Sequence, residues 1–409
     1  MKTLQTSHGA DSPYAWTRLW VALALVTIGG AGMYSMAVVL PPLQAEFGIA
    51  RADASLPFTL TMIGFGLGSV LMGRLSDRFG VIVPVLLGSA SLALGFVTAG
   101  FSRNLLQFTA VHGLLIGVGT SGTFVPLVAD ITLWFTRRRG IAVAIVMSGN
   151  YLAGAVWPPL MQHFIDTAGW RATYMGTGLI CLLAMPLFAL SLRRKPPTIA
   201  APAPARGVSS NPERPLGFSP KQLQGLLCVS GIACCVAMSM PQVHMVAYCT
   251  DLGFPAARGA EMLSIMMAFG IVSRLASGWI ADHIGGLGTL LLGAVLQATA
   301  LALFLPFDGL AALYAVSALF GLFQGGIVPS YPLIVREYFS PREAGARTGT
   351  VIMATLVGMA LGGWMPGWIF DVTGSYRAAF VNGIAWSVVT IGITLVLLSR
   401  ARRLVPREA

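Results

Sequence analysis

The segment GRLSDRFG at residues 73–80 follows a long apolar run, and the related segment GWIADHIG at residues 278–285 follows another. Their aspartates, Asp77 and Asp282, lie 205 positions apart. Two further pairs share this offset: Gly140 with Gly345, and Asp166 with Asp371. Three equal offsets over such a length indicate that the chain is built from two parallel repeats.

Composition predicts that both repeats lie in a membrane. Of the 409 residues, 56% are hydrophobic and 10% are charged, whereas soluble domains carry about 25% charged residues. Runs of about 20 apolar residues cross the hydrocarbon layer as helices. We therefore predict an all-α integral membrane protein with twelve transmembrane helices, six in each parallel repeat. The twelve runs lie at approximately 19–41, 55–76, 81–100, 105–130, 139–164, 171–192, 222–247, 260–281, 287–305, 310–336, 345–370 and 376–400.

The loops predict domain organisation and orientation. A stretch rich in Pro, Ala and Ser at 193–221 is expected to link an N-terminal six-helix bundle (1–192) to a C-terminal one (222–409). With the N-terminus inside, the inner segments hold 20 Lys and Arg residues and the outer loops hold five. The positive-inside rule then places the linker and both termini in the cytoplasm. We expect a multi-pass protein of the plasma (inner) membrane whose functional unit is a monomer.

Several other classes of protein lack support in the sequence. Only three lysines occur and none follows a glycine, so a Walker-type phosphate loop is absent. The basic residues lie in short loops, which argues against a nucleic-acid partner. The five cysteines are odd in number and show no metal-ligand spacing. We find no nucleophile elbow either, and expect no enzyme activity, no cofactor and no metal.

The first segment matches the pattern G-x-L-x-D-R-x-G, and with the two repeats it resembles the major facilitator superfamily. Within that superfamily the chain is similar to the monocarboxylate porter and oxalate/formate antiporter group. The similarity rests on LPPL at 40–43, on WF at 134–135 before RRRG at 137–140, and on Arg274 eight residues before Asp282. It implies alternating access between two rocking halves, with Arg274 as the anchor of a carboxylate.

Two departures from that group narrow the expected substrate. Gly270 stands where mammalian-type porters carry an acidic residue, and 345–370 lacks the lysine of the oxalate exchangers. These differences favour a monoanion over a dicarboxylate.

Arg274 is a single charge inside a span. At 1.5 Å per residue it lies about 12 Å from the inner end, near the bilayer centre, where an arginine costs at least about 2.5–3.5 kcal/mol. All fifteen Asp and Glu residues fall in loops, tails or near predicted span ends. Because a guanidinium fork pairs bidentately with a carboxylate, a substrate carboxylate is the expected counter-ion. Pairing with helix carbonyls or snorkelling to the inner surface is the alternative.

Other polar residues in the spans are candidates to orient the substrate or to carry a proton. His112 and His244 are candidates for proton coupling because histidine titrates near neutrality; alternatively the proton travels with the substrate. Interhelical hydrogen bonding explains each of these residues as well. The substrate-orienting candidates are Tyr34, Gln324, Tyr331, Asn150 and His244.

A set of charges at the inner ends of the helices is predicted to act as a gate that pairs and separates during transport. The alternative is that its arginines only satisfy the positive-inside rule. The set consists of Asp77, Arg78, Asp130, Arg137, Arg138, Arg139 and Asp282.

The resulting hypothesis is a secondary active transporter of a small, lactate- or pyruvate-like monocarboxylate, coupled to protons by symport. Its expected partners are the carboxylate, H⁺ and the lipid bilayer. The alternatives are an efflux carrier for amphipathic compounds and an organic anion exchanger.

Overall fold

The computed structural model describes residues 11–135, 138–194, 215–340 and 343–404, and the regular elements among them are helices. The prediction of an all-α chain is therefore confirmed. Most of the predicted linker at 193–221 falls outside the described residues, because 195–214 are not among them. In chain order the helices are α1 (Pro13–Gly29), α2 (Ala31–Phe47), α3 (Arg51–Phe79), α4 (Ile82–Gly100), α5 (Leu105–Val111), the π-helix η1 (His112–Gly117), α6 (Val118–Ile131), α7 (Arg139–Ala168), α8 (Trp170–Leu190), the 3₁₀-helix η2 (Pro215–Gly217), α9 (Pro220–Asp251), α10 (Ala256–Leu303), α11 (Leu310–Gln324), α12 (Ile327–Tyr338), α13 (Ala344–Thr373) and α14 (Tyr376–Leu404).

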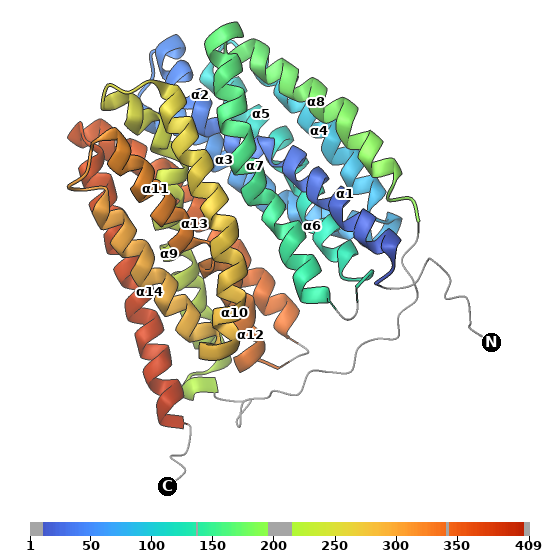
Figure 1. Cartoon of the computed structure of the whole chain (residues 1–409), viewed down its shortest axis with the longest axis vertical. Helices are drawn as coiled ribbons and strands as arrows, with labels where there is room; N and C mark the ends of the chain where they lie inside the picture. The colour runs from blue at the N-terminus through green and yellow to red at the C-terminus, as the bar shows by residue number, and fades with distance from the viewer. Residues whose placement is uncertain (1–10, 136–137, 195–214, 341–342, 405–409) are drawn as a thin grey trace. The chain divides into compact units, whose positions relative to one another are not determined.

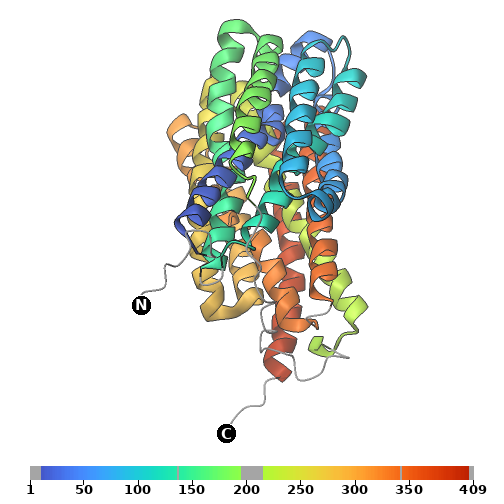
Figure 2. The same ribbon diagram turned by 90° about the vertical axis from the view of Figure 1, so that its right-hand side faces the viewer.

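Contacts group these helices into two compact units. The first unit comprises Met1–Pro202 with Pro255–Ser264, and the second comprises Ala203–Phe254 with Ile265–Ala409. In the first unit α4 packs on α8, and α3 packs on η1 and α6. In the second unit α9 packs against α13 and α14. Figure 1 and Figure 2 show the helices of each unit running side by side.

The described residues contain eleven helices long and apolar enough to cross a membrane, against twelve predicted runs. The difference lies in α10, which covers both the eighth run (260–281) and the ninth (287–305). Its backbone leaves helical geometry at Gly285, with φ 72° and ψ 171°. A glycine adopts this conformation without a Cβ clash, so α10 consists of two helical segments joined at one residue. The twelve-run prediction and the observed helices therefore agree.

The exposed surface of the helices fits a lipid environment. Large apolar side chains remain exposed on membrane-length helices, among them Leu67 (66%), Leu114 (72%) and Leu187 (70%). Monomeric soluble proteins seldom expose broad apolar surface, whereas lipid tails are as apolar as leucine.

Small residues allow the helices of one unit to approach closely. A Cβ added at Gly64 in α3 would lie 1.9 Å from the carbonyl oxygen of Gly113 in η1. No side chain fits in that space, so a glycine is required for the two backbones to touch. Such contacts are the usual basis of helix association in membranes, where apolar surface gains nothing from leaving lipid.

Candidate functional site

Arg274 lies on a turn of α10 that packs against a break in the next span. Its backbone carbonyl accepts a hydrogen bond of 2.9 Å from the Ser277 hydroxyl, and Arg274 is half-buried. A Cβ added at Gly325 would lie 2.4 Å from the carbonyl oxygen of Gly270, and one at Gly326 would lie 2.3 Å from the Ser277 Cβ. The turn that carries Arg274 is thus held against the Gly325–Gly326 segment.

The Gly325–Gly326 segment interrupts what the sequence predicts as one continuous span. Helix α11 ends at Gln324 and α12 begins at Ile327. Both glycines keep right-handed helical dihedrals, with φ −60° and ψ −25° at Gly325 and φ −87° and ψ −10° at Gly326. The interruption is therefore a short departure from regular helical bonding at the level of Arg274.

Gln324 ends α11 as a buried amide with unused hydrogen-bonding capacity. Its Oε1 accepts a hydrogen bond of 3.0 Å from the Nε2 of Gln242 in α9, and Gln324 is fully buried. Its own Nε2 has no hydrogen-bond partner among the described residues. A buried donor without a partner costs about 1–3 kcal/mol. An oxygen atom of a bound ligand would recover that free energy.

Tyr331 is placed differently from Gln324. It is fully buried in α12 within an apolar core that includes Leu227 and Ile334. Its hydroxyl lies 3.1 Å from the Ser230 hydroxyl and donates to the Cys234 sulfur at 3.4 Å. These contacts support the interhelical hydrogen bonding that the sequence analysis left open for this residue.

His244 lies fully buried in α9, in the second unit. Its Nε2 donates to the carbonyl oxygen of Gly363 and its Nδ1 lies 2.8 Å from the hydroxyl of Tyr376. A carbonyl can only accept, so Nε2 carries a proton. In the neutral ring Nδ1 then accepts from Tyr376. Both ring nitrogens are engaged in interhelical contacts.

His112 lies fully buried in the first unit, at the start of the π-helix η1. Its Nδ1 lies 3.1 Å from the Thr61 hydroxyl and its Nε2 lies 3.3 Å from the Tyr174 hydroxyl. The ring also packs against Phe108, with centroids 4.5 Å apart. Short π-helical segments inside α-helices are frequent at functional sites.

The remaining two substrate-orienting candidates belong to the first unit. Tyr34 is buried in α2, with 6% of its surface exposed, and Asn150 is half-buried in α7.

Most of the predicted gating residues lie at exposed helix ends. Asp77 and Arg78 are exposed in the last turn of α3, and Gly80, with φ 80°, turns the chain into α4. Arg138 is exposed ahead of α7, and Asp282 is exposed in α10. Arg137 lies outside the described residues, and the structure describes only the backbone of Arg139, the first residue of α7.

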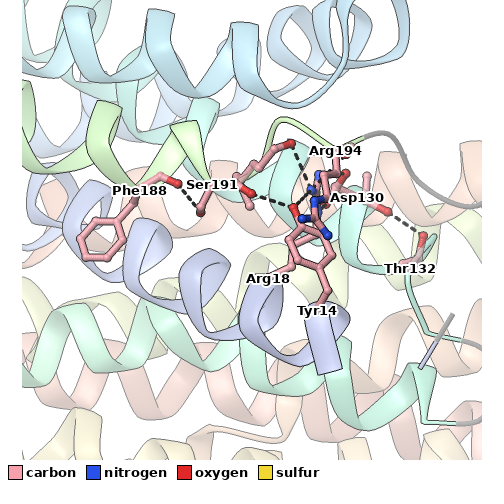
Figure 3. A network of polar contacts seen from close by, with 9 residues as sticks. Tyr14, Arg18, Asp130, Thr132, Phe188, Ser191 and Arg194 are labelled. Carbon is pink, nitrogen blue, oxygen red and sulfur yellow. Dashed lines mark hydrogen bonds and ion pairs between the residues drawn. The ribbon is translucent and has the colours of Figure 1, made fainter. Parts of the chain in front are cut away.

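Asp130 has a partner that the sequence analysis did not single out. Arg18 in α1 binds it bidentately, with Nε donating to Oδ2 at 2.6 Å and Nη2 donating to Oδ1 at 2.8 Å. Arg18 is 2% exposed and Asp130 is 8% exposed. The guanidinium also lies over the Trp134 ring, 4.6 Å from its centroid. Figure 3 shows this network. The sequence offers one sign of this pair, an arginine directly before the first apolar run.

Comparison with known proteins gives consistent matches along most of the chain. The family model described as Major Facilitator Superfamily matches residues 21–311 and 287–409. Monocarboxylate transporter 13 of Bos taurus is 28% identical over 81% of this chain and 76% of the relative. Monocarboxylate transporter 11 of Homo sapiens is 27% identical over 93% and 82%. The MFS-type transporter opdF of Penicillium oxalicum is 27% identical over 80% and 76%.

A solved structure supports the same fold. A bacterial homolog to the human lysosomal transporter Spinster, in an inward-facing and occupied conformation, superposes with a TM-score of 0.70. The match covers 96% of this chain and 98% of the other at 14% sequence identity. At that identity the likeness concerns the fold alone.

Proposed function

Because the chain belongs to the Major Facilitator Superfamily, we propose that it moves a small organic monocarboxylate, such as lactate or pyruvate, across a membrane by secondary active transport. The chain is a multi-pass membrane transporter and not an enzyme. The names of its relatives, monocarboxylate transporters 11 and 13, support the carboxylate as substrate. Alternating access would rock the bundles 1–192 and 222–409 about a site near the middle of the membrane.

The position of Arg274 carries this proposal. It lies in a membrane-length helix, on the turn held against the Gly325–Gly326 break. Gln324, with its unpartnered Nε2, ends the helix at that break. An arginine and an amide donor together suit an anion with an adjacent oxygen, because the guanidinium pairs with the carboxylate and the amide donates to the second group.

Uptake into proteoliposomes tests the role of Arg274. We expect Arg274→Gln to abolish saturable uptake of lactate and pyruvate, and Arg274→Lys to retain a small part of it, since lysine keeps the charge but loses the fork. Arg258→Gln is the matched control. It removes an exposed arginine of the same helix that forms an exposed ion pair with Glu261, three residues along the chain.

Undiminished saturable uptake by Arg274→Gln would overturn the proposal. Transport of cationic or neutral amphiphiles by both variants, without carboxylate uptake by the wild type, would favour an efflux carrier. Uptake that requires a carboxylate on the opposite side would favour an anion exchanger.

For coupling we propose symport with H⁺, with His112 and His244 as the candidates to carry the proton. Each ring has a hydroxyl partner, on Tyr174 or Tyr376, that can switch from donor to acceptor. Each histidine can therefore gain a proton without losing that contact. If one of them couples transport, its change to Gln removes stimulation by an inward proton gradient while exchange of substrate persists. Intact stimulation in both variants would mean that the proton travels with the substrate.

The proposed gate and the proposed orientation each have a test of their own. We propose that Asp77, Arg78 and Asp282 lie on the cytoplasmic side, as do both termini. Labelling of single cysteines placed at Arg78 and Arg103 in sealed membranes should give opposite sidedness, because these positions lie at opposite ends of α4. If Asp77→Asn transported substrate at the wild-type rate, Asp77 would not be part of the gate.

A further inference from the structure

A cavity of about 860 Å³ opens at one end of the first unit, and neither Arg274 nor Gln324 lines it. Its walls come from the end of α3, the turn before α4, the end of α6 and the segment after α8. Cavities of about 300–1,000 Å³ hold small-molecule ligands. The side chains relevant to a ligand here are Arg78, Arg193, Arg194, Asp77, Phe79 and Leu133.

A buried anchor holds two of these arginines at the cavity. Besides its two bonds to Asp130, Arg18 donates from Nη1 to the carbonyl oxygens of Leu192 at 3.0 Å and Arg194 at 3.2 Å. These bonds fix the backbone on both sides of Arg193. The Arg194 guanidinium also stacks on the Tyr14 ring, 4.5 Å from its centroid. The network in Figure 3 thus sets the path of the chain along this wall.

The cavity has a net positive charge. Arg18 and Asp130 neutralise each other as an ion pair. The remaining charged lining residues are three arginines and one aspartate, Asp77. Helix α4 begins at the same wall without a side-chain cap, and the start of a helix adds positive potential. Guanidinium groups bind phosphate oxygens bidentately, so a phosphate group is the anion that fits best.

The apolar rim of the cavity favours a phospholipid over a soluble phosphate. Phe79 is 54% exposed and Leu133 is 47% exposed, and both line it. A soluble phosphate gains nothing from this apolar surface, whereas the acyl chains of a lipid do. We propose that the cavity binds the phosphate headgroup of an anionic phospholipid, with its acyl chains along Phe79 and Leu133. The site shares no residue with the proposed carboxylate site and does not depend on it.

Native mass spectrometry of the delipidated full-length protein tests this site, with phosphatidylglycerol as the probe and phosphatidylcholine as the zwitterionic comparison. Near a membrane surface each arginine is worth about a five-fold change in affinity for anionic lipid. We therefore expect Arg78→Gln/Arg193→Gln to bind phosphatidylglycerol about 25-fold more weakly, and we expect wild-type binding to weaken with added salt.

The matched control is Arg103→Gln/Arg258→Gln, which removes the same charge from exposed positions outside the cavity. It should bind phosphatidylglycerol as the wild type does. For both double variants, the lipid-bound fraction is measured on the peak of the intact folded protein. A loss of folded protein is then not counted as a loss of lipid binding. Equal binding of phosphatidylcholine and phosphatidylglycerol, or equal loss in both double variants, would overturn the proposal. Full displacement of lipid by glycerol phosphate at matched concentration would also overturn it, since the ligand would then be a soluble phosphate ester.

Discussion

Removal of Asp130 gives the most direct test of the buried network in the first unit. Asp130→Ala deletes both charge-assisted hydrogen bonds from Arg18 and leaves a guanidinium that is only 2% exposed. Breaking one side of a buried ion pair costs about 3–5 kcal/mol, because the remaining charge is uncompensated. Arg18 keeps its bonds to the carbonyl oxygens of Leu192 and Arg194. We therefore expect a loss of about 3 kcal/mol, at the lower end of that range.

The assay is a double-mutant cycle of Asp130→Ala, Arg18→Met and the double variant, measured by reversible unfolding in mixed micelles. We expect the double variant to be more stable than Asp130→Ala, with an interaction energy of about 2–3 kcal/mol, because the methionine removes the orphaned charge. Glu261→Ala serves as the control, since its pair with Arg258 is exposed and worth about 0–1 kcal/mol. Additive effects within about 0.5 kcal/mol would refute the reasoning.

Three other outcomes follow from the described contacts. Gln324→Leu should raise the KM for carboxylate uptake several-fold while thermal stability in detergent stays about equal, because the change removes the unpartnered Nε2 of Gln324 but takes the acceptor from the Nε2 of Gln242; an unchanged KM would show that this residue does not contact the substrate. Gly64→Ala should lower the unfolding temperature, since its Cβ would lie 1.9 Å from a backbone oxygen. Gly225→Ala should leave that temperature unchanged or raise it, because the position is helical with no atom within 4 Å of the new Cβ; equal losses at both glycines would contradict the packing. His244→Phe should destabilise the protein, as the bonds to Gly363 and Tyr376 are lost, and the same thermal measurement checks it.

The fold was accessible from the sequence because a membrane simplifies the problem. Backbone groups in lipid must bond within their own helix, so run length alone predicts the helices, and the equal offset of the aspartates reveals the repeat. The ends of the elements were less accessible. The sequence leaves five residues, 282–286, between the eighth and ninth runs, whereas α10 leaves helical geometry only at Gly285.

The candidate site was accessible only in part. The charge of Arg274 inside an apolar run can be recognised from the sequence without knowing its neighbours in space. The partner of Asp130 could not be recognised, because Arg18 lies 112 positions away and reaches it through helix packing. The unpartnered amide of Gln324 likewise depends on where Gln242 lies in another helix. Pair contacts of this kind are properties of the packed structure and leave no local pattern in a single sequence.

The π-helix η1 changes how much length variation the fourth span tolerates. A π-helical turn closes hydrogen bonds from i to i+5 and so contains one residue more than an α-helical turn. The stretches 105–111 and 118–131 on either side are regular α-helix. Deleting one residue within 112–117 would restore continuous α-helical bonding and leave both flanks on their present faces. The same deletion in an uninterrupted helix such as α8 would rotate everything beyond it by about 100°. We therefore expect this span to tolerate the deletion of one residue within 112–117, whereas the same deletion would misalign the rest of an uninterrupted helix.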